Sequence, residues 1–209
     1  MVKRFFNGGS TPSNSIVNDA LITLLSGPPS CGKTSLLFQF AFNVVVQSES
    51  QGYVVFICNR RRFQTKPPFL SQGIDDSSPI FERIQIKYLD DYDDEGLKKY
   101  FSAFHLLNPF PLAVIIDDFG DFFLDSKTAS CQLLLSDTHH GDSPRLLFLY
   151  KRWVSSIFTI QGESQGSGSF YLKHRVHAAG SDSRKMSAKY SIALQYLVLE
   201  GIVEDDAHL

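Results

Sequence analysis

The chain has 209 residues, enough for one α/β domain with a buried core and too few for two domains of ordinary size. Hydrophobic residues make up 43% of it and charged residues 20%, which is typical of a globular protein rather than a disordered one. The formal net charge of −2 argues against a protein that coats nucleic acid through bulk positive charge, so any nucleic-acid contact must come from a local basic patch.

Residues 1–19 are rich in Gly, Ser, Asn and Thr and lack the apolar core of a signal peptide. We expect a flexible lead-in there and a single domain over residues 20–209. The early apolar run at 20–25 is far too short to cross a membrane, so no membrane association is expected. The three cysteines show no metal-ligand spacing and indicate reduced thiols in a cytosolic or nuclear protein.

Strand and helix patterns then alternate along the chain. They predict strands at 21–25, 53–58, 84–89, 112–116 and 132–135, and helices that follow residue 34, begin at Asp93 and Asp94, and begin at Pro144. The first of these helices is apolar nearly all round, which indicates burial between layers, and residues 59–78 have the composition of a loop. Further strands are predicted at 156–161, 170–176 and 192–199, without helices between them. The fold class is therefore α/β, with a mostly parallel sheet extended by antiparallel strands at its C-terminal end.

A glycine-rich loop lies between the first strand and the first helix. Its residues are Gly27, Pro28, Pro29, Ser30, Cys31, Gly32, Lys33 and Thr34, which match the pattern G-x-x-x-x-G-K-[ST] in the strand–loop–helix context that the pattern requires. We call residues 27–34 the phosphate loop. Its backbone N–H groups and the helix start that includes Ser35 suit the phosphates of ATP. Lys33 would place its charge on the β- and γ-phosphates, and the Thr34 hydroxyl would reach Mg²⁺.

The apolar strand at 112–116 ends in two aspartates. An aspartate at the end of a buried parallel strand, beside the strand of the phosphate loop, can hold Mg²⁺ through the water shell of the ion. Asp117 is the predicted metal residue. Asp118 is a candidate catalytic residue that polarises the attacking water, and it is equally a candidate for a solvated turn residue.

Other strand ends carry weaker signals. Residues 136–138 (Ser-Asp-Thr) either sense the γ-phosphate or form only a polar strand end. Arg60, Arg61 and Arg62 follow the second strand at its carboxyl end, the side on which parallel sheets bind ligands. They could contact a nucleic-acid backbone, an acidic partner surface or only solvent. The histidine pairs at 139–140 and at 174 and 177 lack a third ligand of suitable spacing, which favours a structural role over metal binding.

Several segments resemble the RecA-like recombinase paralogues. They are the phosphate loop, the following Leu-Leu-Phe, Val-Phe-Ile-x-Asn-Arg-Arg at 55–61, Arg-Ile-Gln-Ile-Lys-Tyr at 83–88 and Val-Ile-Ile-Asp-Asp at 114–118. More narrowly, they are similar to the small ATPases that partner SWIM-type zinc-finger proteins in homologous recombination. The resemblance covers most of residues 20–161. It implies a P-loop NTPase core, weak DNA-stimulated ATP hydrolysis, single-stranded DNA binding, a recombinase and a SWIM-type protein as partners, and a nuclear location.

Two departures from this family pattern stand out. RecA-like enzymes usually close the second strand with a glutamate that orients water, whereas here that strand ends in Cys58 and Asn59, which weakens the case for fast turnover. They also place a long helix after the magnesium-binding strand, whereas only residues 119–130 lie between Asp118 and Cys131. Because a parallel crossover needs about a dozen residues or more, the sequence suggests a shortened variant.

The leading interpretation is thus an ATP-dependent accessory factor in recombination and DNA repair, with weak ATPase activity. One alternative is a degenerate P-loop scaffold that binds nucleotide without hydrolysing it. A small-molecule kinase is another, against which the late strands look antiparallel and no arginine-rich lid precedes the end of the chain.

Overall fold

The computed structural model describes residues 2–6, 22–48, 52–75, 77–89, 94–119, 132–139, 150, 154, 156–164, 168–175 and 185–205. The described strands form one sheet: β1 (Ile22–Gly27), β2 (Val54–Asn59), β3 (Ile84–Leu89), β4 (Ala113–Ile116), β5 (Gln132–Thr138), β6 (Ser156–Gly162), β7 (Ser169–Arg175), β8 (Lys185–Ala193) and β9 (Tyr196–Asp205). The described helices are α1 (Lys33–Gln47), α2 (Arg60–Thr65) and α3 (Asp94–Ser102), with short 3₁₀ helices at Val2–Phe5, Pro79–Arg83 and Phe104–Leu106.

The order of the strands across the sheet is β3-β2-β4-β5-β1-β6-β7-β8-β9. Every pairing from β3 to β6 is parallel, and every pairing from β6 to β9 is antiparallel. The protein is therefore α/β, with a mostly parallel sheet and antiparallel strands at its C-terminal end, as the sequence predicts. Because the carboxyl ends of parallel strands meet at one edge, the residues that follow β1, β2, β4 and β5 lie together.

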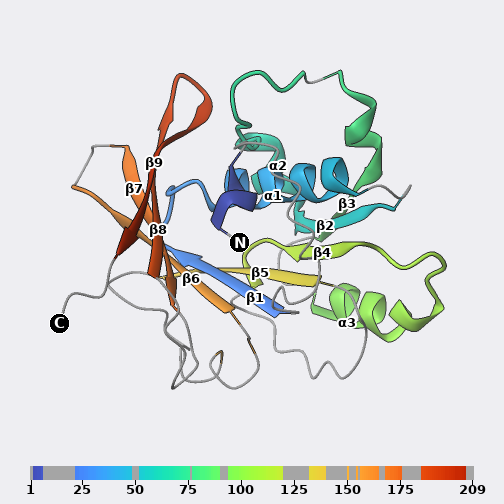
Figure 1. Ribbon diagram of the computed structural model, residues 1–209. Helices are drawn as coiled ribbons and strands as arrows, with labels where there is room; N and C mark the ends of the chain where they lie inside the picture. The colour runs from blue at the N-terminus through green and yellow to red at the C-terminus, as the bar shows by residue number, and fades with distance from the viewer. Residues whose placement is uncertain are drawn as a thin grey trace.

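Two apolar cores cover the two faces of the parallel strands. Helix α1 lies on one face and α3 on the other (Figure 1). Successive residues of one strand alternate between the cores: Leu25 faces the α1 side, whereas Leu24 packs on the α3 side. Helix α1 is buried nearly all round, as predicted, and its Phe38 packs edge-on against Phe56 of β2.

The first residues of the chain belong to the core, which corrects the expected flexible lead-in for residues 2–6. Phe5 is fully buried, and its ring lies 5.4 Å from the rings of both Phe40 of α1 and Phe158 of β6. Phe6 is also buried and packs against Tyr190 of β8. Polar neighbours in the sequence concealed these two phenylalanines, and the rest of the predicted lead-in, residues 7–19, lies outside the described residues.

Two other predictions are wrong in part. The predicted loop 59–78 contains helix α2, whose start is capped by Asn59: its side chain accepts a hydrogen bond from the Arg62 N–H at 3.0 Å. The predicted strand 192–199 contains a hairpin turn, at which Leu194 and Gln195 have φ of 50° and 65°. Such turns usually carry Asn or Gly, so no turn residue marks this position in the sequence.

The suspected short crossover connects β4 to its parallel neighbour β5. Residues 120–131, including most of the predicted 119–130 segment, lie outside the described residues, as does most of the helix predicted from Pro144. None of the described helices combines the length and apolarity needed to span a bilayer.

Candidate functional site

The phosphate loop connects β1 to α1 in a conformation that needs glycine at one position. Gly32 has φ of 82°, in the left-handed region, and stands at the N-terminal cap of α1. Its carbonyl accepts the first helical hydrogen bond, from the Leu36 N–H at 2.9 Å. Ser30 is also left-handed, with φ of 59°. The backbone therefore turns twice before the helix begins, and the free N–H groups of the first helical turn lie at this end of α1.

Lys33 folds back over the loop that precedes it. Its side chain is buried, and its Nζ donates to the Gly27 carbonyl at 3.1 Å and the Pro28 carbonyl at 2.9 Å. Two neutral backbone carbonyls of the phosphate loop thus hold the ammonium group against the loop. A carbonyl oxygen carries only a partial negative charge, whereas phosphate oxygens are ionised and attract an ammonium group more strongly, so an anion can compete for this lysine.

Thr34, at the start of α1, forms a hydrogen bond with Asp117, which follows β4. The Thr34 hydroxyl donates to Asp117 Oδ2 at 2.6 Å, and the Ser136 hydroxyl donates to Asp117 Oδ1 at 2.7 Å. The prediction that the strand of Asp117 lies beside that of the phosphate loop is wrong, because β5 pairs with both β1 and β4 and separates them. Ser136, at the end of β5, bridges this gap.

Asp118 is partly exposed and is held in place by several hydrogen bonds. Its backbone has φ of 56°, its N–H donates to Ser136 Oγ at 2.6 Å, and its Oδ1 accepts from the Thr138 hydroxyl at 2.7 Å. Its Oδ2 is paired with Arg62 of α2. Asp118 therefore links the end of β5 to α2, and each of its carboxylate oxygens has a hydrogen-bond or ion-pair partner.

Burial changes the protonation of the acidic groups here. Desolvation, followed by the charge of Asp118, raises the pKa of Asp117, although hydrogen bonds from Thr34 and Ser136 oppose the rise. Desolvation also raises the pKa of Asp137, and the charge of Lys33 opposes it. The ionised forms of Asp117 and Asp137 are thus disfavoured in the free protein, and a bound cation would stabilise them.

Asp137 gives the free protein a predictable pH dependence. Its folded pKa lies above its ordinary value of 3.8, so between these two values the native state binds more protons than the unfolded state. The contribution of Asp137 to the free energy of unfolding should therefore fall as the pH rises through that window. In urea denaturation from about pH 4 upward, the slope of the free energy of unfolding against pH should be less negative in Asp137→Asn than in the unmodified protein. The exposed Glu95→Gln is the control, and equal slopes in all three proteins would contradict the prediction.

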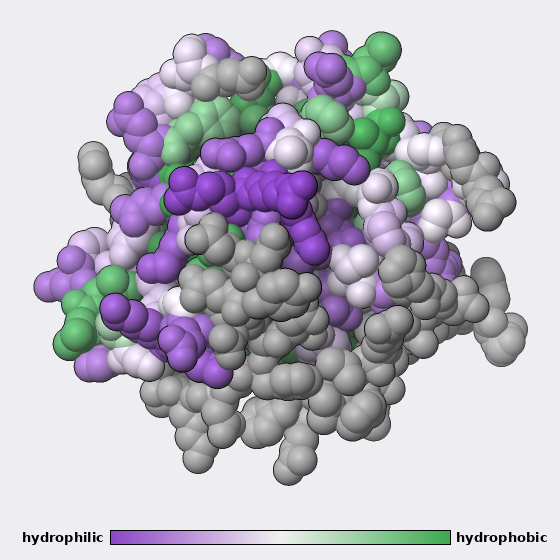
Figure 2. Space-filling model, turned by 180° about the vertical axis from the view of Figure 1, so that it is seen from behind, coloured by the Kyte–Doolittle hydropathy of each residue, from purple (hydrophilic) through white to green (hydrophobic). Residues whose placement is uncertain are grey.

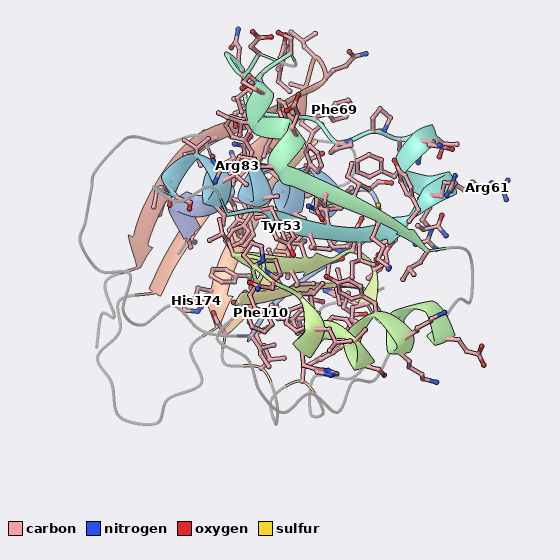
Figure 3. The ribbon with its side chains drawn as sticks, turned by 90° about the vertical axis from the view of Figure 1, so that its right-hand side faces the viewer. Tyr53, Arg61, Phe69, Arg83, Phe110 and His174 are labelled. Atoms are coloured by element: carbon pink, nitrogen blue, oxygen red, sulfur yellow. The ribbon has the colours of Figure 1, made fainter. Side chains whose placement is uncertain are left out.

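The three arginines lie in the first turn of α2, all exposed. Arg60 lies over the ring of Tyr88 at 5.0 Å, Arg62 pairs with Asp118, and Arg61 points outward (Figure 3). Positive charge at a helix N-terminus is unfavourable because it opposes the helix dipole. β2 ends in Asn59 without a carboxylate, and among the described residues Asp118 forms the ion pair with Arg62.

Sequence reasoning missed a polar stripe along the otherwise apolar α1. The Ser35 hydroxyl and the Gln39 amide oxygen accept hydrogen bonds from the backbone N–H groups of Phe69 and Ser71, at 2.9 and 3.0 Å. Asn43 donates to the Phe6 carbonyl at 3.2 Å. Their four-residue spacing, which places them on one face of a helix, was the available signal. Ser35, predicted to help bind phosphate, thus also holds the segment that follows α2.

The described histidines form no metal centre. The described residues hold no group of three or more His, Cys, Asp or Glu side chains suited to a metal ion, and the second member of each predicted histidine pair lies outside them. His174 lies within hydrogen-bond distance of the Ser156 hydroxyl, at 2.7 Å, and stacks on Phe158. Among the residues coloured by hydropathy on the face seen from behind, hydrophobic ones lie in separate groups between hydrophilic ones (Figure 2).

No family model and no curated protein matches the sequence. The function has to be inferred from the chemistry of the site.

Proposed function

We propose that this chain is a P-loop protein of the RecA-like type that binds ATP with Mg²⁺. The observation that carries the proposal is the 2.6 Å hydrogen bond between Thr34, at the start of α1, and Asp117, beyond β4. This bond joins a hydroxyl of the phosphate loop to the carboxylate at the end of β4, two features that are far apart in the sequence. The buried Lys33 lies next to Thr34 in the same loop. A chance glycine-rich turn gives no reason for this convergence.

The residues present fit a nucleotide-bound Mg²⁺. Hydroxyl and carboxylate oxygens are the ligands that this ion prefers, and phosphates and water complete its shell, so no larger cluster of protein ligands is needed. When bound, the ion would neutralise phosphate charge and orient the γ-phosphate. Thr34 would hold the ion directly and Asp117 through water, while Lys33 would exchange the Gly27 and Pro28 carbonyls for phosphate oxygens.

We further propose slow hydrolysis and a role as an accessory factor in homologous recombination. Slow turnover is supported by the end of β2, which carries no carboxylate, and by Asp118, whose oxygens are engaged by Thr138 and Arg62. The resemblance supports the nuclear location, the SWIM-type and recombinase partners, and single-stranded DNA as a ligand. The exposed arginines of α2 are the DNA-contact candidates.

Lys33→Ala tests nucleotide binding. Loss of charge-assisted bonds to phosphate should weaken ATP binding at least tenfold, by about 1.5–3 kcal/mol for each such bond, as measured by calorimetry with Mg²⁺. The exposed Lys99→Ala on α3 is the matched control and should bind ATP normally. Equal ATP affinity in the two variants would refute a phosphate role for Lys33.

A triple Arg60→Ala, Arg61→Ala, Arg62→Ala variant tests DNA contact. It should lose salt-sensitive binding to single-stranded DNA, while the double variant Lys98→Ala, Lys99→Ala on the opposite face should keep it. Unchanged DNA binding in the triple variant would remove α2 from the interface.

The alternative of a P-loop scaffold that binds nucleotide without hydrolysing it is tested by the same experiments. It is favoured by the missing carboxylate after β2, and it predicts tight ATP binding with no phosphate release, with or without single-stranded DNA. Measurable DNA-stimulated hydrolysis that disappears in Lys33→Ala would exclude the scaffold.

A further inference from the structure

Strand β8, far from the phosphate loop in sequence, packs directly against it. Tyr190 is fully buried, and its hydroxyl donates to the Cys31 carbonyl at 2.7 Å. Two residues further on, Ile192 fills the space beside Gly32: a Cβ on Gly32 would lie 2.4 Å from Ile192 Cδ1. The antiparallel part of the sheet thus holds one peptide of the loop, that between Cys31 and Gly32.

This hydrogen bond sets the direction in which the peptide faces. A trans peptide is planar, so its C=O and N–H point in opposite directions. Because the Cys31 carbonyl is turned into the core toward Tyr190, the Gly32 N–H is turned the other way, to the side from which a phosphate would approach. Glycine accepts either sign of φ, so the intrinsic backbone preference of Gly32 does not fix the orientation of this peptide, and the hydrogen bond from Tyr190 supplies that constraint.

We infer that Tyr190 is a positioning residue for phosphate binding, which presents the Gly32 N–H to the phosphates by holding the Cys31 carbonyl. The inference rests on the proposed nucleotide binding, which it deepens. The tyrosine ring is itself fixed between Phe6, at 5.6 Å, and Phe170, on which it stacks at 5.5 Å. Burial raises the pKa of Tyr190 well above its ordinary value, so the hydroxyl keeps its proton and remains a donor.

Tyr190→Phe tests the inference, because it keeps the ring and removes only the donor. Calorimetry with ATP and with inorganic tripolyphosphate, below the unfolding temperature of the variant, should show both affinities falling by the same factor of about five to ten. Tripolyphosphate carries no base or sugar, so a parallel loss assigns the effect to phosphate contacts. Tyr171→Phe on β7, whose hydroxyl donates to the surface Glu163 at 3.0 Å, should bind both ligands normally.

Each outcome decides the matter. Unchanged affinities in Tyr190→Phe, with or without a loss of thermal stability, would overturn the positioning role, while weakened binding in Lys33→Ala would leave the proposed function standing. No ATP binding by the unmodified protein would overturn both. A second measurement needs no variant: the amide resonance of Gly32 in the unmodified protein should shift when tripolyphosphate is added, and an unmoved resonance would contradict the inference.

Discussion

Replacing Phe5 with alanine is expected to lower the free energy of unfolding by about 3–5 kcal/mol. The side chain is fully buried and packs against aromatic rings of α1 and β6, so its removal leaves a cavity that rigid neighbours cannot fill. This loss is a large fraction of the roughly 5–15 kcal/mol that holds a domain folded. Urea denaturation followed by circular dichroism measures it.

Val46→Ala provides the comparison, because Val46 stands on α1 but is 51% exposed. Its free energy of unfolding should stay within about 0.5 kcal/mol of that of the unmodified protein. A similarly small change in Phe5→Ala would show that residues 2–6 are not part of the core.

Asp117→Asn is expected to remove most of the contribution that Mg²⁺ makes to ATP binding, with the affinity for the ion falling about 10- to 100-fold. The amide oxygen can still accept the hydrogen bond from Thr34, but the negative charge that attracts the cation is gone. In the free protein the change removes the cost of burying an ionised carboxylate, but only one of the hydrogen bonds from Thr34 and Ser136 keeps an oxygen acceptor.

The measurement is ATP affinity across a Mg²⁺ titration, with a chelator at its lower end. The unmodified protein should gain affinity as Mg²⁺ rises, and Asp117→Asn should show little gain. Asp75→Asn, in a loop exposed to solvent, should respond to Mg²⁺ as the unmodified protein does. An unaltered response in Asp117→Asn would exclude Asp117 from the metal site.

Local signals in the sequence predicted the parallel part of the fold well. The phosphate loop, β1 and α1 form one contiguous stretch, whose glycines, lysine and apolar helix need no distant information. Asp117 could also be predicted, because the order of strand and helix in a parallel sheet places strand ends at one edge. The bond between Thr34 and Asp117 is where these two inferences meet.

What sequence reasoning missed depends on residues brought together by tertiary packing. Nothing near Tyr190 marks it as a neighbour of Cys31, and the position of β5 between β1 and β4 is a property of the whole sheet. The Leu194–Gln195 turn lies inside a segment that reads as one strand, with no Gly, Asn or Pro to mark a turn. The pairing of β8 with β9 imposes positive φ on two residues that rarely adopt it.

The burial of the first residues has a consequence for how the chain folds. Phe5 and Phe6 are synthesised early, yet they pack against Phe158 and Tyr190, which are synthesised late. This part of the core cannot close until β6 and β8 have left the ribosome, and contacts so distant in sequence slow folding. During that interval the part of the core between Phe5, Phe40 and Phe158 stays open, and exposed apolar surface of this kind favours aggregation of a partly folded chain.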